Sequence, residues 1–174
     1  MPGLQAGKRR QSIGHFTWHL FRRLISFTTC QFLLLLTLPM KSARNEILFR
    51  DTYIAIEYCP EDNWLYVNWR GYVNFDTVSA GCEEILKCLK NYQCAKVLND
   101  NTNVEGIWSG ASKWVGQDWM PRMREAGLQH FAWVYSPSTL SRLSTDKSIK
   151  NTSEKELIKT FESVVEAEDW LRMV

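Results

Sequence analysis

The sequence lacks an excess of charge of either sign. Its 174 residues include 21 Lys and Arg against 19 Asp and Glu, a formal net charge of +2 at pH 7. Basic residues are concentrated at the start of the chain, where they include Lys8, Arg9, Arg10, Arg22 and Arg23. Without these five, the remaining chain is mildly acidic and lacks the electrostatic pattern of a nucleic-acid-binding domain. We therefore expect no nucleic-acid partner.

Cysteine motifs are absent as well. The five cysteines form no C-x-x-C pair, and their spacing matches no zinc ribbon or zinc finger. They are Cys30, Cys59, Cys82, Cys88 and Cys94. This pattern favours buried, reduced thiols in a cytosolic protein, and we expect neither a metal ion nor a cofactor.

Histidine is scarce, and its positions favour no catalytic site. His15 and His19 form an H-x-x-x-H pair, but no Glu follows His15 and no third ligand is evident, so we expect no metal there. Beyond residue 40 the only histidine is His130, and nothing in the sequence marks a partner for it. A hydrolase-like enzyme built on Asp100 and His130 is the weaker alternative to a protein without enzymatic activity.

Loops that bind nucleotides or activate a serine are also missing. The stretch Gly106-Ile107-Trp108-Ser109-Gly110 differs from the nucleophile elbow G-x-S-x-G, because Gly106 lies three residues before Ser109 instead of two. The same glycines form neither G-x-G-x-x-G nor a Walker loop. We interpret Ser109 as the cap of a helix.

No apolar run reaches the roughly 20 residues that a membrane span needs. The run Leu24 to Leu38 lies behind a basic flank, as in a signal peptide, but no A-x-A-like cleavage site follows it. Met40 opens a polar stretch and is an alternative start of translation. Residues 1–44 are thus a signal-like, anchor-like or wrongly assigned N-terminal extension. We expect a cytoplasmic domain at residues 45–174, with membrane anchoring or export through residues 1–39 as the alternative.

From Ile47 onward, strands and helices alternate. Two strands (53–58 and 64–69) flank the turn Pro60 to Asn63 and predict a β-hairpin. Asn74 is expected to cap a helix that runs to about Asn91. Further strands are expected at 95–99, 131–135 and 159–162, with surface loops at 100–106 and 144–153. A second helix is expected from Ser109 through Trp119, kinked or restarted at Pro121 and stopped by Gly127. Shorter helices are expected at 139–143 and 164–171. The order predicts an α/β fold: a mixed, largely parallel four- to five-stranded sheet with an N-terminal hairpin and helices packed on it.

A ligand or interaction loop is expected after the third strand, because open α/β sheets bind ligands beyond the carboxyl ends of their strands. Seven of the eight tryptophans lie beyond residue 60, and they fill a core or line an aromatic pocket. The candidate residues are Asp100, Asn101, Thr102, Trp108, Ser109 and Trp114.

Several short stretches resemble the SpoIIAA-like (STAS-like) family, which is related in fold to the STAS and CRAL-TRIO groups. They span about Ile47 to the C-terminus, and the similarity is greatest to a bacterial branch of the family. The stretches are Trp69-Arg70-Gly71-Tyr72, Val97-Leu98-Asn99-Asp100-Asn101, Trp114-Val115, Ala126-Gly127-Leu128, Phe131-Ala132-Trp133-Val134 and Ala167-Glu168-Asp169-Trp170-Leu171.

The resemblance implies one α/β domain that acts through protein interaction or holds small or lipid-like ligands. The anti-sigma-antagonist branch carries a phosphorylatable serine after a central strand, but Asn99 to Asn103 contains none and offers only Thr102. A phosphate at Thr102 would add nearly two negative charges beside Asp100, with no arginine nearby in the sequence. We expect a non-enzymatic binding or regulatory module that acts through protein interaction. The alternative is a carrier of a small apolar or lipid-like ligand, with a membrane partner only if the N-terminal segment is genuine.

Overall fold

A computed structural model of the chain describes residues 44–174. The predictions for the N-terminal extension, for the His15–His19 pair and for Cys30 lie outside the described residues. Six strands form one sheet, in the order β1-β2-β3-β4-β5-β6. The strands are β1 (Glu46–Arg50), β2 (Ile54–Cys59), β3 (Trp64–Tyr72), β4 (Lys96–Glu105), β5 (His130–Val134) and β6 (Ile158–Phe161).

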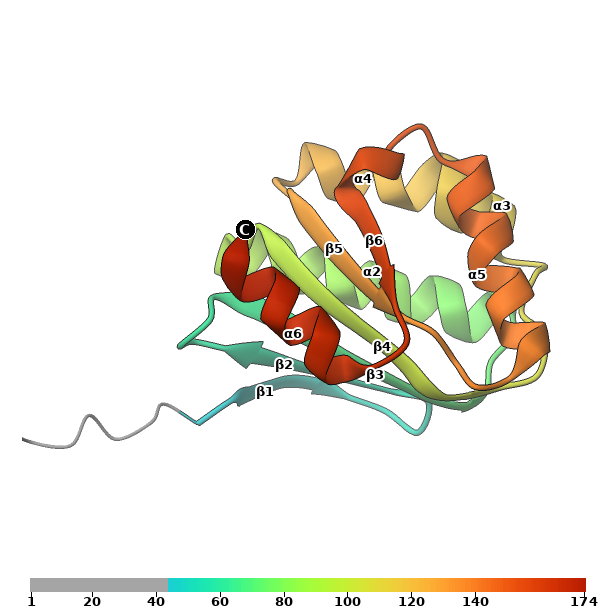
Figure 1. The fold of residues 1–174 in the computed structure, drawn as a ribbon, viewed down its shortest axis with the longest axis horizontal. Coiled ribbons are helices and arrows are strands. Elements are labelled where there is room, and N and C mark those ends of the chain that lie inside the picture. Colours follow the sequence, from blue (N-terminus) through green and yellow to red (C-terminus); the bar gives the residue numbers. More distant parts are fainter. Residues whose placement is uncertain (1–43) are drawn as a thin grey trace, which may run out of the picture. The chain divides into compact units, whose positions relative to one another are not determined.

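Helices follow every strand from β3 onward (Figure 1). The helices are α2 (Phe75–Tyr92), α3 (Ser112–Trp114), the π-helical turn η1 (Val115–Trp119), α4 (Met120–Glu125), α5 (Thr139–Asn151), the 3-10 turn η2 (Lys155–Leu157) and α6 (Val164–Met173). Within residues 44–174, no helix is long and apolar enough to cross a membrane.

β2 runs opposite to the other five strands, so the pairing changes from antiparallel to parallel at β3. β1, β2 and β3 are antiparallel, whereas β3, β4, β5 and β6 are parallel. The parallel strands are joined by helical crossovers between sequential neighbours, and such crossovers are almost always right-handed. A constant hand places α2, the α3–η1–α4 segment and α5 on one face of the sheet, and α6 lies on the other (Figure 1).

Two hydrophobic cores result from this arrangement. The larger core lies between the sheet and the crossover helices, with fully buried side chains that include Ile56, Leu65, Ile85 and Phe131. The smaller one lies under α6, and includes Leu98, Ala132 and Leu171. In β4 the alternation of side chains sends Val97, Asn99 and Asn101 toward the larger core and Leu98 and Asp100 toward the smaller one.

Local signals in the sequence explain the ends of two helices. The side chain of Asn74 accepts a hydrogen bond from the Thr77 amide at 3.0 Å, and the Thr77 hydroxyl accepts one from the Asn74 amide at 2.9 Å. This reciprocal capping box fixes the start of α2, as the sequence predicts. Gly127 follows α4 with φ +107, in the region that glycine enters without strain.

The α/β class, the N-terminal hairpin and the largely parallel sheet agree with the sequence prediction, but three element assignments were wrong. The sheet has six strands instead of four or five, because Glu46–Arg50 adds an edge strand. Residues 100–105, predicted as a loop, continue β4, where they pair with β3 across a bulge. Residues 144–151, predicted as a surface loop, extend α5.

Ser109 is not a helix cap, which corrects a fourth prediction. The next helix begins only at Ser112, its N-cap residue is Ala111, and no side chain caps it. Ser109 instead lies in a turn in which its carbonyl oxygen accepts a hydrogen bond from the Ser112 amide at 3.3 Å.

Candidate functional site

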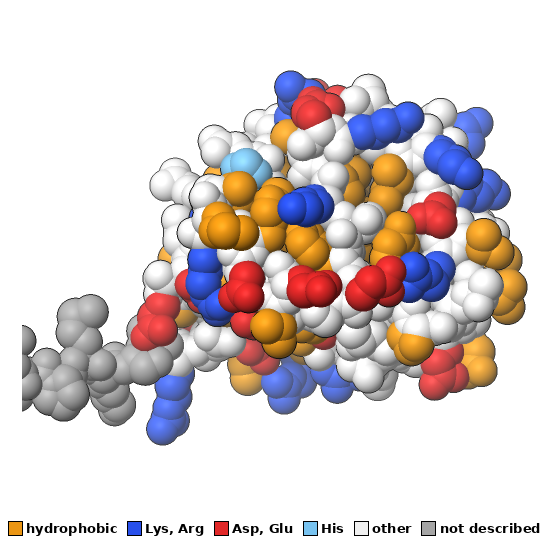
Figure 2. All heavy atoms as spheres, in the orientation of Figure 1, with side chains coloured by type: hydrophobic (Ala, Val, Ile, Leu, Met, Phe, Trp, Pro, Cys, Tyr) orange, Lys and Arg blue, Asp and Glu red, His pale blue; other side chains and the backbone are white. Residues whose placement is uncertain are grey.

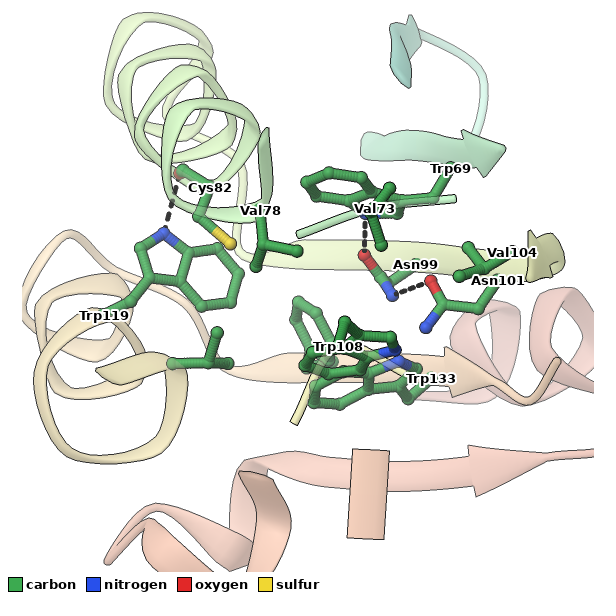
Figure 3. Close-up of a pocket in the computed structure, with 12 residues that line it drawn as sticks. Trp69, Val73, Val78, Cys82, Asn99, Asn101, Val104, Trp108, Trp119 and Trp133 are labelled. Carbon is green, nitrogen blue, oxygen red and sulfur yellow. Dashed lines mark hydrogen bonds between the residues drawn. The ribbon is translucent and has the colours of Figure 1, made fainter. Parts of the chain in front are cut away.

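An aromatic cavity lies between the sheet and the helices α2 and η1 (Figure 3). Its volume is about 30 Å³, room for roughly two water molecules. We call it the tryptophan cavity, because four of its twelve lining residues are tryptophans: Trp69, Trp108, Trp119 and Trp133. Asn99 and Asn101 are the only side chains with an amide among its described lining residues.

The two asparagines belong to a relay of hydrogen bonds that begins on β3. Trp69 Nε1 donates to Asn99 Oδ1 at 2.9 Å, and Asn99 Nδ2 donates to Asn101 Oδ1 at 3.0 Å (Figure 3). All three side chains are at least 95% buried. An indole can only donate, so Trp69 fixes the orientation of both amides and leaves Asn101 Nδ2 as the last donor of the relay.

The indole nitrogens of the other three tryptophans differ in their partners. Trp119 Nε1 donates to the carbonyl oxygen of Cys82 at 2.7 Å, and Trp108 Nε1 donates to Ser141 Oγ at 3.1 Å. Trp133 Nε1 is buried and has no hydrogen-bond partner among the described residues. Such an orphaned donor is costly, because its hydration is lost and nothing replaces it.

Trp108 forms a wall of the cavity from the segment between β4 and α3. Its ring stacks on that of Trp133, with centroids 6.2 Å apart and an interplanar angle of 17°. Its backbone amide donates to Ser144 Oγ at 3.1 Å, in addition to the indole bond to Ser141. Two serine hydroxyls of α5 therefore hold this wall in place.

The tryptophan cavity carries no charged side chain among residues 44–174. Cys82 is its one titratable lining residue in that range, and burial raises the pKa of the Cys82 thiol well above its usual value. The thiol therefore stays protonated at neutral pH. The lining is thus apolar, with hydrogen-bond donors from Asn101 and Trp133.

Two of the six residues predicted for the ligand loop line the tryptophan cavity, and the other four lie elsewhere. Asn101 and Trp108 line the tryptophan cavity. Asp100 and Thr102 belong to β4, and Asp100 lies on the opposite face of the sheet from Asn101. Trp114 lies in α3, and its ring packs against that of Phe75 with centroids 6.2 Å apart. Ser109 lies in the turn described above.

Asp100 is buried and already engaged. Its Oδ2 accepts a hydrogen bond from the Tyr66 hydroxyl at 2.7 Å, and its Oδ1 accepts one from the Thr102 amide at 2.8 Å. Burial, and then the hydrogen bond to Asp100, raise the pKa of Tyr66. Asn68 Nδ2 donates to the Tyr66 hydroxyl at 3.1 Å. The carboxylate thus belongs to a structural network that joins β3 to β4.

His130 and Asp100 do not form a pair. His130 is opposite Lys96 in the register of β4 and β5, whereas Asp100 is opposite Val134. Along the strands these two cross-strand pairs are four residues apart, a distance of about 13 Å. The His130 ring instead packs against that of Trp170 of α6, with centroids 5.7 Å apart. Figure 2 shows an exposed hydrophobic area on one face of the molecule. On that face, acidic and basic side chains are interspersed.

Metal chemistry has no evident site in the described part of the chain. No group of three His, Cys, Asp or Glu side chains there could hold an ion. The four cysteines from Cys59 onward are buried free thiols.

Sequence reasoning named Asn101 as a site residue but missed Asn99, its hydrogen-bond partner in the cavity. Asn99 was included in the motif that suggests the family, but the loop prediction began at Asp100, so the continuing alternation of Val97, Asn99 and Asn101 was not used. The signal that identifies these two asparagines is a polar side chain at strand positions that, by alternation, face the core. Trp69 and Trp133 were predicted only as members of the set of tryptophans that fill a core or line an aromatic pocket, and nothing in the local sequence distinguishes their two indole environments.

A comparison of the chain with models of known protein families finds no match, and no curated protein matches it significantly.

Proposed function

We propose that residues 45–174 form a non-enzymatic binding module that holds a small apolar ligand in the tryptophan cavity. One observation carries this proposal: Trp133 is only 4% exposed, lines the cavity, and its Nε1–H has no partner among the described residues. A ligand that accepts this hydrogen bond would remove a penalty of about 1–3 kcal/mol. Aromatic walls with a few convergent polar groups are typical of small-molecule sites.

The resemblance to STAS-like domains supports binding in preference to catalysis. A lipid-like ligand has less support than a compact one, because the cavity volume is only about 30 Å³. The proposal includes a cytoplasmic location, since Cys59, Cys82, Cys88 and Cys94 are buried free thiols of the kind that persist in reducing compartments.

Protein interaction is the second candidate, favoured by an exposed apolar surface at the carboxyl ends of β3 and β4. Tyr72 is 79% exposed, Ile107 57% and Phe75 47%. A Cβ added to Gly106 would lie 2.8 Å from the Tyr72 ring, so this ring covers the glycine. The surface adjoins Val73 and Val104, which line the cavity.

The indole N–H resonances in a ¹H–¹⁵N NMR spectrum test the proposal. Trp133→Phe identifies the Trp133 signal by its loss, and Trp64→Phe does the same for a tryptophan of the smaller core. Titration with benzene and with cyclopentanone at millimolar concentration is expected to shift the Trp133 signal and to leave the Trp64 signal unchanged. If neither compound shifts the Trp133 signal, the cavity is not a ligand site, and protein interaction becomes the leading function.

A further inference from the structure

We infer that the ligand of the tryptophan cavity is an uncharged, compact molecule with a carbonyl-type oxygen, which accepts hydrogen bonds from Trp133 Nε1 and Asn101 Nδ2. This inference rests on the proposed function and names the class of ligand. It follows from the direction of the hydrogen bonds, from the absence of charge in the described lining, and from the size of the cavity.

The direction of the hydrogen bonds decides that the ligand is an acceptor. The Trp69 indole has no acceptor atom, so Asn99 must present its oxygen to Trp69 and its nitrogen to Asn101. Asn101 must then accept through its oxygen, and its Nδ2 hydrogens are left for another partner. In Figure 3 this nitrogen points toward the stacked pair of Trp108 and Trp133.

A second donor supports the same conclusion. Trp133 Nε1 is buried without a partner in the described structure, and Trp133 belongs to the same cavity lining as Asn101. A carbonyl oxygen has two lone pairs and satisfies two such donors at once. A protonated amine or a guanidinium group has hydrogen-bond donors and no acceptor. It would therefore add donors to a cavity that already has two.

Charge decides between a neutral carbonyl and a carboxylate. No Lys, Arg or His of residues 44–174 lines the cavity. A carboxylate would therefore be buried without a cation, and the loss of hydration is far larger for a charged group than for a neutral one. Fatty acids and other anions are thus disfavoured relative to ketones, amides and esters of similar shape.

Size decides which wall must move. A volume of about 30 Å³ holds roughly two water molecules, so a ligand with several carbon atoms requires the cavity to widen. Among the four lining tryptophans, Trp108 alone lies outside a helix or strand, which makes it the one best placed to yield. Its hydrogen bonds to Ser141 and Ser144 must then break or move with α5. The indole signal of Trp108 should therefore change together with that of Trp133 on binding.

Three probes of one size class test the inference on the full chain: cyclopentanone, cyclopentane and cyclopentanecarboxylate at pH 7. Affinities are taken from the indole and methyl NMR shifts. Cyclopentanone is expected to bind about tenfold more tightly than cyclopentane, because two neutral hydrogen bonds are worth about that factor. The carboxylate is expected to bind more weakly than either.

Variants show whether the named donors cause the preference. Trp133→Phe replaces the indole with a smaller aromatic ring and removes the donor, so the preference for cyclopentanone over cyclopentane should fall to about threefold or less, with cyclopentane binding largely retained. Asn101→Ala should reduce the preference independently, which covers the case that Trp133→Phe fails to fold. Trp64→Phe, in the smaller core, should leave the preference unchanged.

The outcomes separate this inference from the proposed function. Equal binding of cyclopentane and cyclopentanone would overturn the inference and leave an apolar site in place. Tighter binding of the carboxylate would overturn the assignment of a neutral ligand. If no probe binds, both the inference and the proposed function are wrong.

Discussion

Trp69 donates its indole hydrogen bond to Asn99 at 2.9 Å, and this contact ties β3 to β4 inside the larger core. The same contact sets the orientation of the Asn99 amide. Asn99 Nδ2 in turn donates to Asn101 Oδ1 at 3.0 Å and so orients Asn101. The stability of the sheet and the polarity of the tryptophan cavity therefore depend on one pair of side chains.

Replacing Asn99 with Leu should destabilise the domain by about 1–3 kcal/mol, because Trp69 Nε1–H stays buried without an acceptor. Urea unfolding measures the loss. The double variant Trp69→Phe/Asn99→Leu should be more stable than the sum of the two single changes predicts, by roughly 1 kcal/mol. Strict additivity in this double-mutant cycle would contradict the coupling that the geometry indicates.

Gly81→Ala should destabilise the domain, although alanine normally improves a helix interior by about 1 kcal/mol. A Cβ at this position of α2 would lie 2.8 Å from Trp69 Cζ3 and 3.0 Å from Ile54 Cδ1. The expected net loss is about 1–3 kcal/mol in urea unfolding. In a Trp69→Leu background the same change should become neutral or stabilising. A gain of stability in the unmodified chain would show that the ring moves freely.

Gly116→Ala should cost about 2–3 kcal/mol, because η1 and α5 approach closely there. A Cβ would lie 2.6 Å from the carbonyl oxygen of Ser148, a backbone atom that cannot rotate away. Gly110→Ala is the matched control: no atom lies within 4 Å of its Cβ, and the expected change is within about 0.5 kcal/mol. Thermal unfolding of the two variants compares them directly, and equal midpoints would be evidence against the close contact.

Cys59 and Cys94 should resist alkylation in the native protein. Burial raises the pKa of each thiol to about 11. At pH 8 the reactive thiolate is then at least about a hundredfold rarer than in an exposed cysteine. Iodoacetamide labelling, resolved by peptide mass spectrometry, should therefore be at least that much slower than in the urea-unfolded chain. Comparable rates in the two states would mean that these thiols are accessible.

The same thiols give stability a defined pH dependence. In the folded state they stay protonated up to pH values near 11, whereas in the unfolded chain they ionise near pH 8.5. Their contribution is therefore fully present below about pH 8.5 and is lost as the pH rises toward 11. The free energy of unfolding should decline over that window, and the decline should be smaller in Cys59→Ala/Cys94→Ala.

Periodicity and turn chemistry were sufficient for the parts of the fold with strong local signals. Helix α2 was predicted from apolar spacing and from Asn74, and the capping box confirms its start. Alternating strands and helices predicted the α/β class and the largely parallel sheet. These signals work because each is set by neighbours in the chain: a side chain that satisfies the first amides of a helix, or an apolar stripe at helical spacing.

Helix α5 shows where local signals fail. Its second half contains Ser144, Thr145 and Ser148, which are polar and typical of a loop. In the fold they are nearly fully buried, and the Ser144 carbonyl oxygen accepts a 2.8 Å hydrogen bond from Ser112 Oγ. Small residues are needed there because α3 and η1 approach α5 closely, and the approach is a property of the tertiary structure.

By itself, the sequence determined the fold class, the hairpin, the cap of α2 at Asn74 and the absence of recognised catalytic motifs. Only the tertiary structure decided which tryptophans have partners and which face of β4 carries Asn101 and which carries Asp100. It also decided that a cavity lies between β4 and α2. The physical reason is that strand alternation assigns a side chain to a face only once the strand's limits are known. Hydrogen-bond satisfaction, in turn, depends on atoms such as Asn99 Oδ1 and Trp69 Nε1, 30 residues apart in the chain and 2.9 Å apart in the fold.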